Sequence, residues 1–134
     1  MTLARILVVD DNPTNLKLVS DLLAFEGHEI LNAMDAEAAQ VVLTQTLPDL
    51  ILMDIALPGM DGLTLTRQLK ADARTRHIRI VALTAFAMKG DKQKALDAGC
   101  DGYISKPIDT RAFPGEVADI LTRARGRNHA DKTL

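Results

Sequence analysis

Polar side chains that could handle a metal ion and a phosphoryl group stand at the ends of four of the five short apolar runs in this sequence. They are Asp10 and Asp11 after the first run, Asp54 at the end of the third, Thr84 at the end of the fourth and Lys106 just past the fifth. Three carboxylates in one crevice would repel one another, and a divalent cation such as Mg2+, which prefers hard oxygen ligands, would relieve that repulsion. A lysine adds a fixed positive charge and a threonine adds a hydroxyl donor. Together these groups could position a phosphoryl group and neutralise its oxygens.

Each of these residues also has a simpler explanation when it is taken alone. The segment Asp10–Asn12 could serve only as a helix cap, and Asp54 could simply form the turn that leads to Pro58. Thr84 could merely end a strand, and Lys106 could be an exposed charge before a proline turn. These separate explanations would all have to hold at once. They would also leave unexplained why every one of these residues falls at the end of a predicted strand. The combination therefore favours one shared site.

The pattern of apolar residues, caps and breakers predicts five strands that alternate with five helices. The strands are expected at residues 3–9, 29–33, 49–55, 77–84 and 101–105, and the helices at 13–26, 35–46, 62–73, 87–98 and from 114 onward. Short connections and right-handed crossovers then give an α/β fold, a doubly wound (βα)5 five-stranded parallel sheet. The carboxyl ends of its strands share one edge, where ligands bind. The candidate residues should therefore meet there.

Caps and prolines predict where several of these elements begin. Asn12 can cap a helix whose first position suits Pro13, and Asp61 can cap the third helix. Pro114 disfavours helical geometry at Phe113, so a single turn at residues 110–112 is expected before the last helix. The continuous apolar run before Asp54 is typical of a strand that is buried on both faces.

Length and composition predict one domain at residues 1–126 and a flexible polar tail at 127–134 of the 134-residue chain. The chain is 47% hydrophobic and 25% charged, and its formal net charge of −2 argues against a nucleic-acid partner. A single cysteine, Cys100, allows no internal disulfide and fits a reducing compartment. The run Ile6–Val9 is too short to span a bilayer, and the first residues lack the design of a signal peptide. We expect a cytoplasmic protein without a membrane partner.

Four motifs in register resemble the CheY-like receiver domain of bacterial two-component response regulators, over about residues 4–122. They are Asp10-Asp11-Asn12, Asp54 within Leu52-Met53-Asp54-Ile55-Ala56-Leu57-Pro58-Gly59-Met60-Asp61-Gly62, Thr84-Ala85 and Lys106-Pro107. An aspartate at one strand end is common, whereas four such motifs at four strand ends are very specific. Within the family, residues 84–91 and 103–108 look most like the stand-alone DivK-type regulators and the receivers of hybrid kinases.

The resemblance implies the flavodoxin-like strand order 2-1-3-4-5 for the sheet. It also implies a phosphoacceptor and a set of metal ligands. Asp54 would take a phosphoryl group from the phosphohistidine of a sensor histidine kinase or of a histidine phosphotransfer protein. Asp11 and Asp54 would ligate Mg2+ directly, and Asp10 would help through water. The backbone carbonyl of Ala56 would complete the protein ligands, so the side chain at this position need not be polar.

The resemblance also implies how the phosphoryl group would be held and sensed. Lys106 would pair with the group, and Thr84 would donate its hydroxyl to it. The Lys106–Pro107 peptide bond is expected to be cis, a conformation that proline tolerates. Tyr103 would be the aromatic switch that turns inward as Thr84 moves. The sequence departs from better-known receivers at Ala56, which cannot orient an attacking water, and at the bulky Phe86. Our own hypothesis is that Phe86 shields the phosphoryl group and lengthens its lifetime.

The signal would pass through the face made by the fourth helix, the fifth strand and the fifth helix to a separate effector protein. The chain would not be an enzyme beyond its own phosphorylation and dephosphorylation, and it would be a monomer or a weak homodimer. The start at Met1 and the short polar tail favour a free-standing regulator. The alternatives are a receiver cut from a hybrid histidine kinase and a receiver-shaped interaction module that works without phosphorylation.

Small-molecule enzymes with the same fold fit the sequence less well. The segment after the first strand, Asp10-Asp11-Asn12-Pro13-Thr14, lacks the hydroxyl- and glycine-rich phosphate loop of flavodoxins. It also lacks the Gly-x-Gly-x-x-Gly motif of dinucleotide-binding proteins. Haloacid-dehalogenase-type phosphatases carry Asp-x-Asp at this position, and the spacing here differs.

Overall fold

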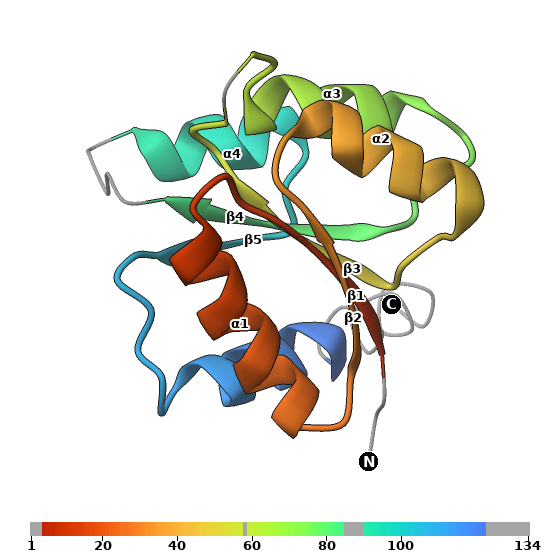
Figure 1. Cartoon of the computed structure of the whole chain (residues 1–134). Coiled ribbons are helices and arrows are strands. Elements are labelled where there is room, and N and C mark those ends of the chain that lie inside the picture. Colours follow the sequence, from red (N-terminus) through yellow and green to blue (C-terminus); the bar gives the residue numbers. More distant parts are fainter. Residues whose placement is uncertain (1–3, 58, 85–89, 123–134) are drawn as a thin grey trace, which may run out of the picture.

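The computed structural model describes residues 4–57, 59–84 and 90–122, which alternate between strands and helices (Figure 1). The elements are β1 (Arg5–Val9), α1 (Pro13–Phe25), β2 (Glu29–Ala33), α2 (Ala36–Gln45), β3 (Leu50–Asp54), α3 (Gly62–Ala71), β4 (Arg79–Thr84), α4 (Asp91–Ala98) and β5 (Gly102–Ser105), and residues 113–122 are helical. All neighbouring strands are parallel, in the order β2-β1-β3-β4-β5. The predicted fold class and strand order are confirmed.

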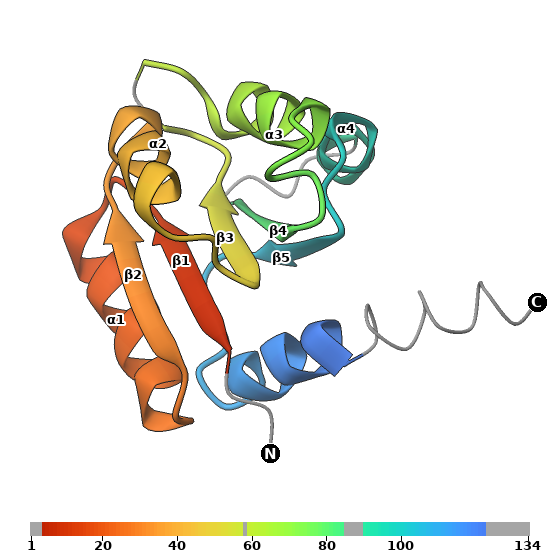
Figure 2. The ribbon, with the colours of Figure 1, turned by 90° about the vertical axis from the view of Figure 1, so that its right-hand side faces the viewer.

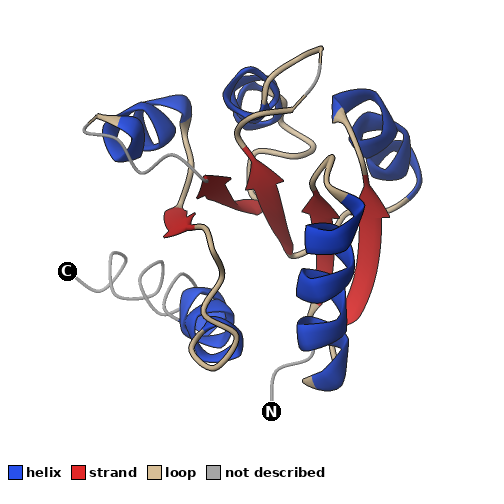
Figure 3. Ribbon diagram, turned by 60° about the vertical axis from the view of Figure 1, so that its left-hand side comes forward, coloured by secondary structure: helices blue, strands red, loops and turns tan. Residues whose placement is uncertain are grey.

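Helices cover both faces of the sheet (Figures 2 and 3). α1 and the helical residues 113–122 pack on one face, and α2, α3 and α4 pack on the other. The side chains of β3 alternate between the two faces of the sheet, so this strand contributes to the core on both sides. Ile51 and Met53 belong to the core under α2, α3 and α4, whereas Leu50 and Leu52 belong to the core under α1. Every residue of β3 is buried, so the central strand is buried on both faces as predicted.

The predicted helix caps are also confirmed. The side chain of Asn12 accepts hydrogen bonds from the backbone N–H groups of Thr14 and Asn15, with Pro13 at the first helical position. The side chain of Asp61 accepts from Thr64 N at 2.8 Å and fixes the start of α3. These caps satisfy N–H groups that have no partner within a helix. They also fix where α1 and α3 begin at the carboxyl edge of the sheet.

Several predicted boundaries differ from the structure by one or two residues, and two of these differences have a clear local cause. β4 begins at Arg79 rather than at residue 77, because the preceding residues form turns in which Thr75 N donates to Asp72 O and Ile78 N donates to Thr75 O. The last helix begins at Phe113 rather than at residue 114, after the expected turn at 110–112. Phe113 N donates to Asp109 O at 2.8 Å, so this hydrogen bond brings Phe113 into the helix despite the proline that follows.

Some predictions fall outside the described residues. They concern Phe86, the first turn of the fourth helix at 87–89 and the tail at 127–134. Within the described part of the chain, no helix is both long and apolar enough to cross a membrane.

Candidate functional site

The predicted site residues gather at the carboxyl edge of the sheet because parallel strands end there side by side. Val9, the last residue of β1, is in register with Met53, so Asp10 and Asp54 follow on neighbouring strands. Thr84 at the end of β4 is in register with Ser105 on β5. Lys106 comes next, and its backbone N–H donates to Thr84 O at 2.7 Å. The strand ends thus supply the site without help from long loops.

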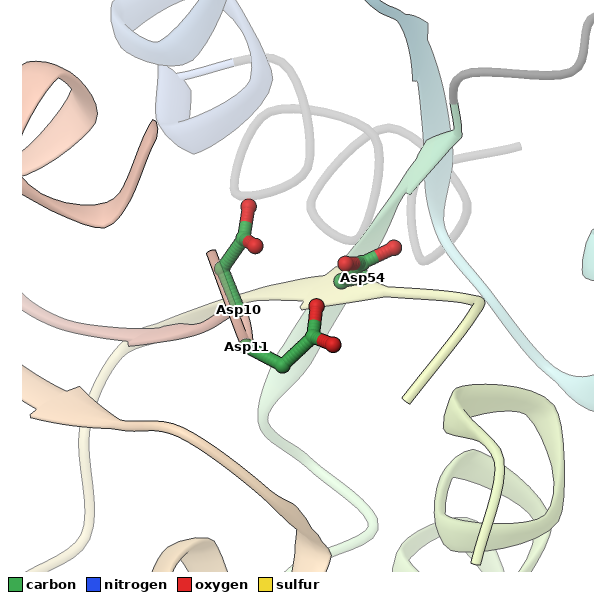
Figure 4. A group of neighbouring side chains, drawn as sticks. All are labelled: Asp10, Asp11 and Asp54. Atoms are coloured by element: carbon green, nitrogen blue, oxygen red, sulfur yellow. The ribbon is translucent and has the colours of Figure 1, made fainter. Parts of the chain in front are cut away.

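Three carboxylates meet at this edge. Figure 4 shows Asp10 and Asp11 leaving the end of β1, with Asp54 across from them at the end of β3. One oxygen from each carboxylate lies within 4.8 Å of the other two. Asp10 and Asp54 are buried, whereas Asp11 is exposed and opens the cluster to solvent. The set offers only hard oxygen ligands, which is the donor chemistry that suits Mg2+.

Lys106 lies between two of these carboxylates. Its Nζ is 3.1 Å from Asp10 Oδ2 and 3.4 Å from Asp54 Oδ2, and its side chain is only 16% exposed. One ammonium therefore faces two buried carboxylates, and the exposed Asp11 belongs to the same group of carboxylates. The site carries more negative than positive charge, which a bound divalent cation would offset. The Lys106–Pro107 peptide bond is cis, as the resemblance implied.

The carboxylate of Asp54 is held in an environment that disfavours its charge. Burial raises the pKa of Asp54 above the ordinary aspartate value, and the negative charge of Asp10 adds to this effect. Lys106 and the backbone N–H of Ala56, which donates to Asp54 Oδ1 at 3.1 Å, oppose the shift in part. Oδ1 is thus fixed by the backbone, and Oδ2 faces Lys106.

The remaining predicted residues lie around this centre. Thr84 is buried at the end of β4, and Ala56 is exposed in the loop after β3. Tyr103 lies two residues earlier on β5 than Ser105 and is paired with Ala82. It is half-buried against the core under α2, α3 and α4, outside the group of three carboxylates.

Sequence reasoning missed Asn15, whose side-chain amide Nδ2 donates to Asp10 Oδ2. Asn15 is half-buried in the first turn of α1. One signal was present in the sequence, because Asn15 continues the stripe of Val19 and Leu23 toward the start of the helix at intervals of four residues. A polar residue in line with a buried apolar stripe needs a polar partner.

Gly62 was missed as well, and it lets α3 approach the end of β3. A Cβ at this position would lie 2.2 Å from the backbone oxygen of Asp54, which no side chain can tolerate. Gly62 N donates to Ile55 O at 3.0 Å, so the start of the helix is tied to the residue after Asp54. Its signal was a glycine at the first helical position, where its low helix propensity suggests a close contact.

Comparison with known proteins agrees with this geometry. The model of the response regulator receiver domain family matches residues 6–118. The polar-differentiation response regulator DivK of Brucella anthropi is 44% identical over 116 residues, which cover 87% of this chain and 94% of that protein. A CheY-like response regulator receiver domain protein from Methanospirillum hungatei has a TM-score of 0.84 and 28% identity, over 94% of this chain and 99% of its own.

The receiver domain of a sensor histidine kinase from Pseudomonas aeruginosa has a TM-score of 0.78 and 34% identity, over 91% of this chain and 97% of its own. That structure holds a magnesium ion coordinated in the active site cleft. The match to the family model covers most of the chain, and the relatives align over nearly their whole lengths. The chain therefore belongs to the response regulator receiver domain family of two-component signalling.

Proposed function

We propose that this chain accepts a phosphoryl group on Asp54 from a sensor histidine kinase or a histidine phosphotransfer protein, with Mg2+ held by Asp11, Asp54 and the carbonyl of Ala56. The single observation that carries this proposal is the position of Lys106 Nζ between the buried carboxylates of Asp10 and Asp54. A buried cation facing an acidic cluster can both keep a nucleophilic carboxylate ionised and pair with an incoming anionic group. When bound, Mg2+ would neutralise the phosphoryl oxygens.

The transfer itself requires little covalent help from the chain. A carboxylate oxygen of Asp54 forms a bond to phosphorus as the bond from phosphorus to the donor's imidazole nitrogen breaks, and the imidazole keeps the electron pair. The product is an acyl phosphate. The Ala56 N–H on Asp54 Oδ1 orients the carboxylate, and Lys106 faces Oδ2. The chain would catalyse only its own phosphorylation and dephosphorylation, and would not act as an enzyme on other molecules.

The new charge would then shift the population of a second conformation. Thr84 would donate its hydroxyl to the phosphoryl group, and Tyr103 on the neighbouring strand would turn inward. The face made by α4, β5 and the helical residues 113–122 would carry the signal to a separate effector in the cytoplasm. The chain would act as a monomer or a weak homodimer. The proposed shielding by Phe86 concerns a residue outside the described part of the chain.

Phosphorylation by a small donor tests this proposal. The chain is incubated with acetyl phosphate and Mg2+, and phosphorylated protein is separated on a Phos-tag gel. We expect a shifted band for the wild type and none for Asp54→Asn. Asp21→Asn is the matched control, because it removes an exposed carboxylate from α1 and should leave the shift intact. An unshifted wild type with an intact fold would instead support an interaction module that works without phosphorylation.

A further inference from the structure

Asp10 is the most deeply buried of the three carboxylates, and its oxygens are occupied by donors from within the chain. Its side chain has no exposed surface. Oδ1 accepts from the backbone N–H of Asn12 at 2.9 Å. Oδ2 accepts both from Lys106 Nζ at 3.1 Å and from the side-chain amide of Asn15. A buried carboxylate needs such donors, because an unpaired charge away from water is strongly unfavourable.

The Asn15 amide reaches Asp10 from a fixed position. Asn15 lies in the first turn of α1, and its backbone N–H donates to the capping oxygen of Asn12 at 3.1 Å. Asn12 in turn donates its own backbone N–H to Asp10. The cap and the first turn therefore hold both the carboxylate and the amide that binds it. Asn15 is half-buried, whereas its neighbour Thr14 is exposed.

Lys106 contacts both Asp10 and Asp54, so the hydrogen bond from Asn15 to Asp10 affects how firmly Lys106 is held. Its Nζ bonds Asp10 Oδ2 and lies somewhat farther, at 3.4 Å, from Asp54 Oδ2. The proposed acyl phosphate on Asp54 would require this ammonium as its counter-charge. If Lys106 were the only donor to Asp10 Oδ2, moving Lys106 to the phosphoryl group would leave a buried oxygen without a hydrogen bond. The free-energy cost of that unsatisfied oxygen would oppose the phosphoryl transfer.

We propose that Asn15 is a positioning residue that keeps a neutral donor on Asp10 Oδ2, so that Lys106 can move from the carboxylate pair to the phosphoryl group. This inference rests on the proposed function of Asp54. It predicts that Asn15 acts through Lys106 and not on the phosphoryl group itself. It also gives Asp10 a second role besides water-mediated metal binding, as the residue that holds Lys106 before phosphorylation.

Asn15→Asp is the sharpest variant, because it keeps the size of the side chain and replaces the donor by an acceptor. A purely structural role of Asn15 predicts that this change lowers the stability of the fold, because a second carboxylate would repel buried Asp10, but it predicts no selective loss in the phosphorylation rate of the folded chain. The positioning role predicts that Lys106 is held more firmly by two carboxylates. We expect the rate of phosphorylation by acetyl phosphate at saturating Mg2+ to fall by about tenfold in Asn15→Ala, and by more in Asn15→Asp. Thr14→Ala, one residue away, should leave the rate unchanged.

Binding of beryllofluoride with Mg2+ provides a measurement that does not depend on turnover. Its dissociation constant should rise by about tenfold in Asn15→Ala, the loss expected for one hydrogen bond to a charged group. In a Lys106→Met background, where no ammonium can move, Asn15→Ala should have little further effect on that constant. A structural role of Asn15 would give the same loss in both backgrounds.

The two proposals fail in different ways. Wild-type rates and beryllofluoride affinity in both Asn15 variants would overturn the positioning role and leave Asp54 as the phosphoacceptor. Equal effects of Asn15→Ala with and without Lys106 would also overturn it. A wild-type chain that acetyl phosphate does not modify would overturn the proposed function, and the inference about Asn15 with it.

Discussion

The two ends of the sheet each hold a lysine, but in different surroundings. At the amino end, Lys70 binds one carboxylate and two neutral backbone carbonyls, whereas at the carboxyl end Lys106 faces two carboxylates. Lys70 Nζ donates to the backbone oxygens of Arg76 and Ile78, at 3.2 and 2.7 Å, and to Asp101 Oδ2 at 2.9 Å. Asp101 Oδ2 also accepts from Ile80 N at 2.9 Å. One cation is thus paired with one carboxylate, and each of the two also has hydrogen bonds with neutral backbone groups.

Lys106 has no such balance. Its ammonium faces two buried carboxylates, a third lies nearby, and the pKa of Asp54 is raised because burial outweighs the help that Lys106 gives. The balanced pair joins α3 to the turns before β4 and β5, and so serves the fold. The unbalanced group stores an electrostatic penalty that binding or chemistry can relieve. The same sheet therefore carries a structural end and a reactive end.

The largest change in stability is expected at Gly62, where the start of α3 packs against the backbone of Asp54 at the carboxyl end of the sheet. Gly62→Ala would place a methyl group against the carbonyl oxygen of Asp54, which lies 2.2 Å from the ideal Cβ position, so α3 would have to shift away. We expect a loss of about 3 kcal/mol in the free energy of unfolding. Urea denaturation measures it.

The matched control is Gly115→Ala, within the helical residues 113–122. A Cβ there would meet nothing within 4 Å, so alanine should stabilise the chain by about 0.5–1 kcal/mol through its higher helix propensity. Equal changes in the free energy of unfolding of the two variants would show that the close contact between α3 and the backbone of Asp54 does not contribute to stability.

The structural end is tested by Lys70→Met, which keeps the aliphatic stem that lies against Gly99 and removes the ammonium. Two carbonyls and Asp101 would each lose a donor. We expect a loss of about 2 kcal/mol in the free energy of unfolding, with phosphorylation by acetyl phosphate unaffected. The control is Lys17→Met, because the Lys17–Asp21 pair is exposed and should contribute less than about 0.5 kcal/mol. A loss no greater than that of Lys17→Met would remove the contrast between the two ends.

The sequence predicts the reactive end better than the structural one. Asp10, Asp54 and Lys106 could be placed together because each follows an apolar run, and parallel strands bring their carboxyl ends to one edge. The caps Asn12 and Asp61 could be identified because capping depends on residues close in the sequence. The fold and the centre of the site thus follow from local patterns and one topological rule.

The contacts that the sequence does not predict are those that depend on tertiary packing. Lys70 and Asp101 are 31 residues apart, and nothing local to either one indicates the other. The contact between Gly62 and the Asp54 carbonyl exists only because α3 packs closely on the end of β3. The spacing of Asn15 with Val19 and Leu23 indicates that its amide needs a polar partner, but only the path of the loop before α1 makes that partner Asp10.

Asp54→Asn is expected to change the free energy of unfolding least, and to raise it, because removing the charge of Asp54 should stabilise the chain. The pKa of Asp54 is raised in the fold, chiefly by burial, so between its unfolded and folded pKa values the folded state binds more protons. Stability due to this group is therefore present at low pH and is lost as pH rises through that interval. Near neutral pH and without Mg2+, Asp54→Asn should be more stable than the wild type, by less than Gly62→Ala loses.

The pH dependence of this difference separates charge from packing. Urea midpoints of the wild type and Asp54→Asn should converge as pH is lowered from neutral toward the ordinary aspartate range, because the carboxyl of Asp54 in the folded wild type then becomes protonated and loses its charge. Asp21→Asn, at an exposed pair, should show no such convergence. Adding Mg2+ should narrow the gap at neutral pH, since a ligand that binds only the folded wild type stabilises it. A gap that is constant with pH and unchanged by Mg2+ would mean that Asp54 carries no electrostatic penalty, and the two ends of the sheet would then not differ in the way described.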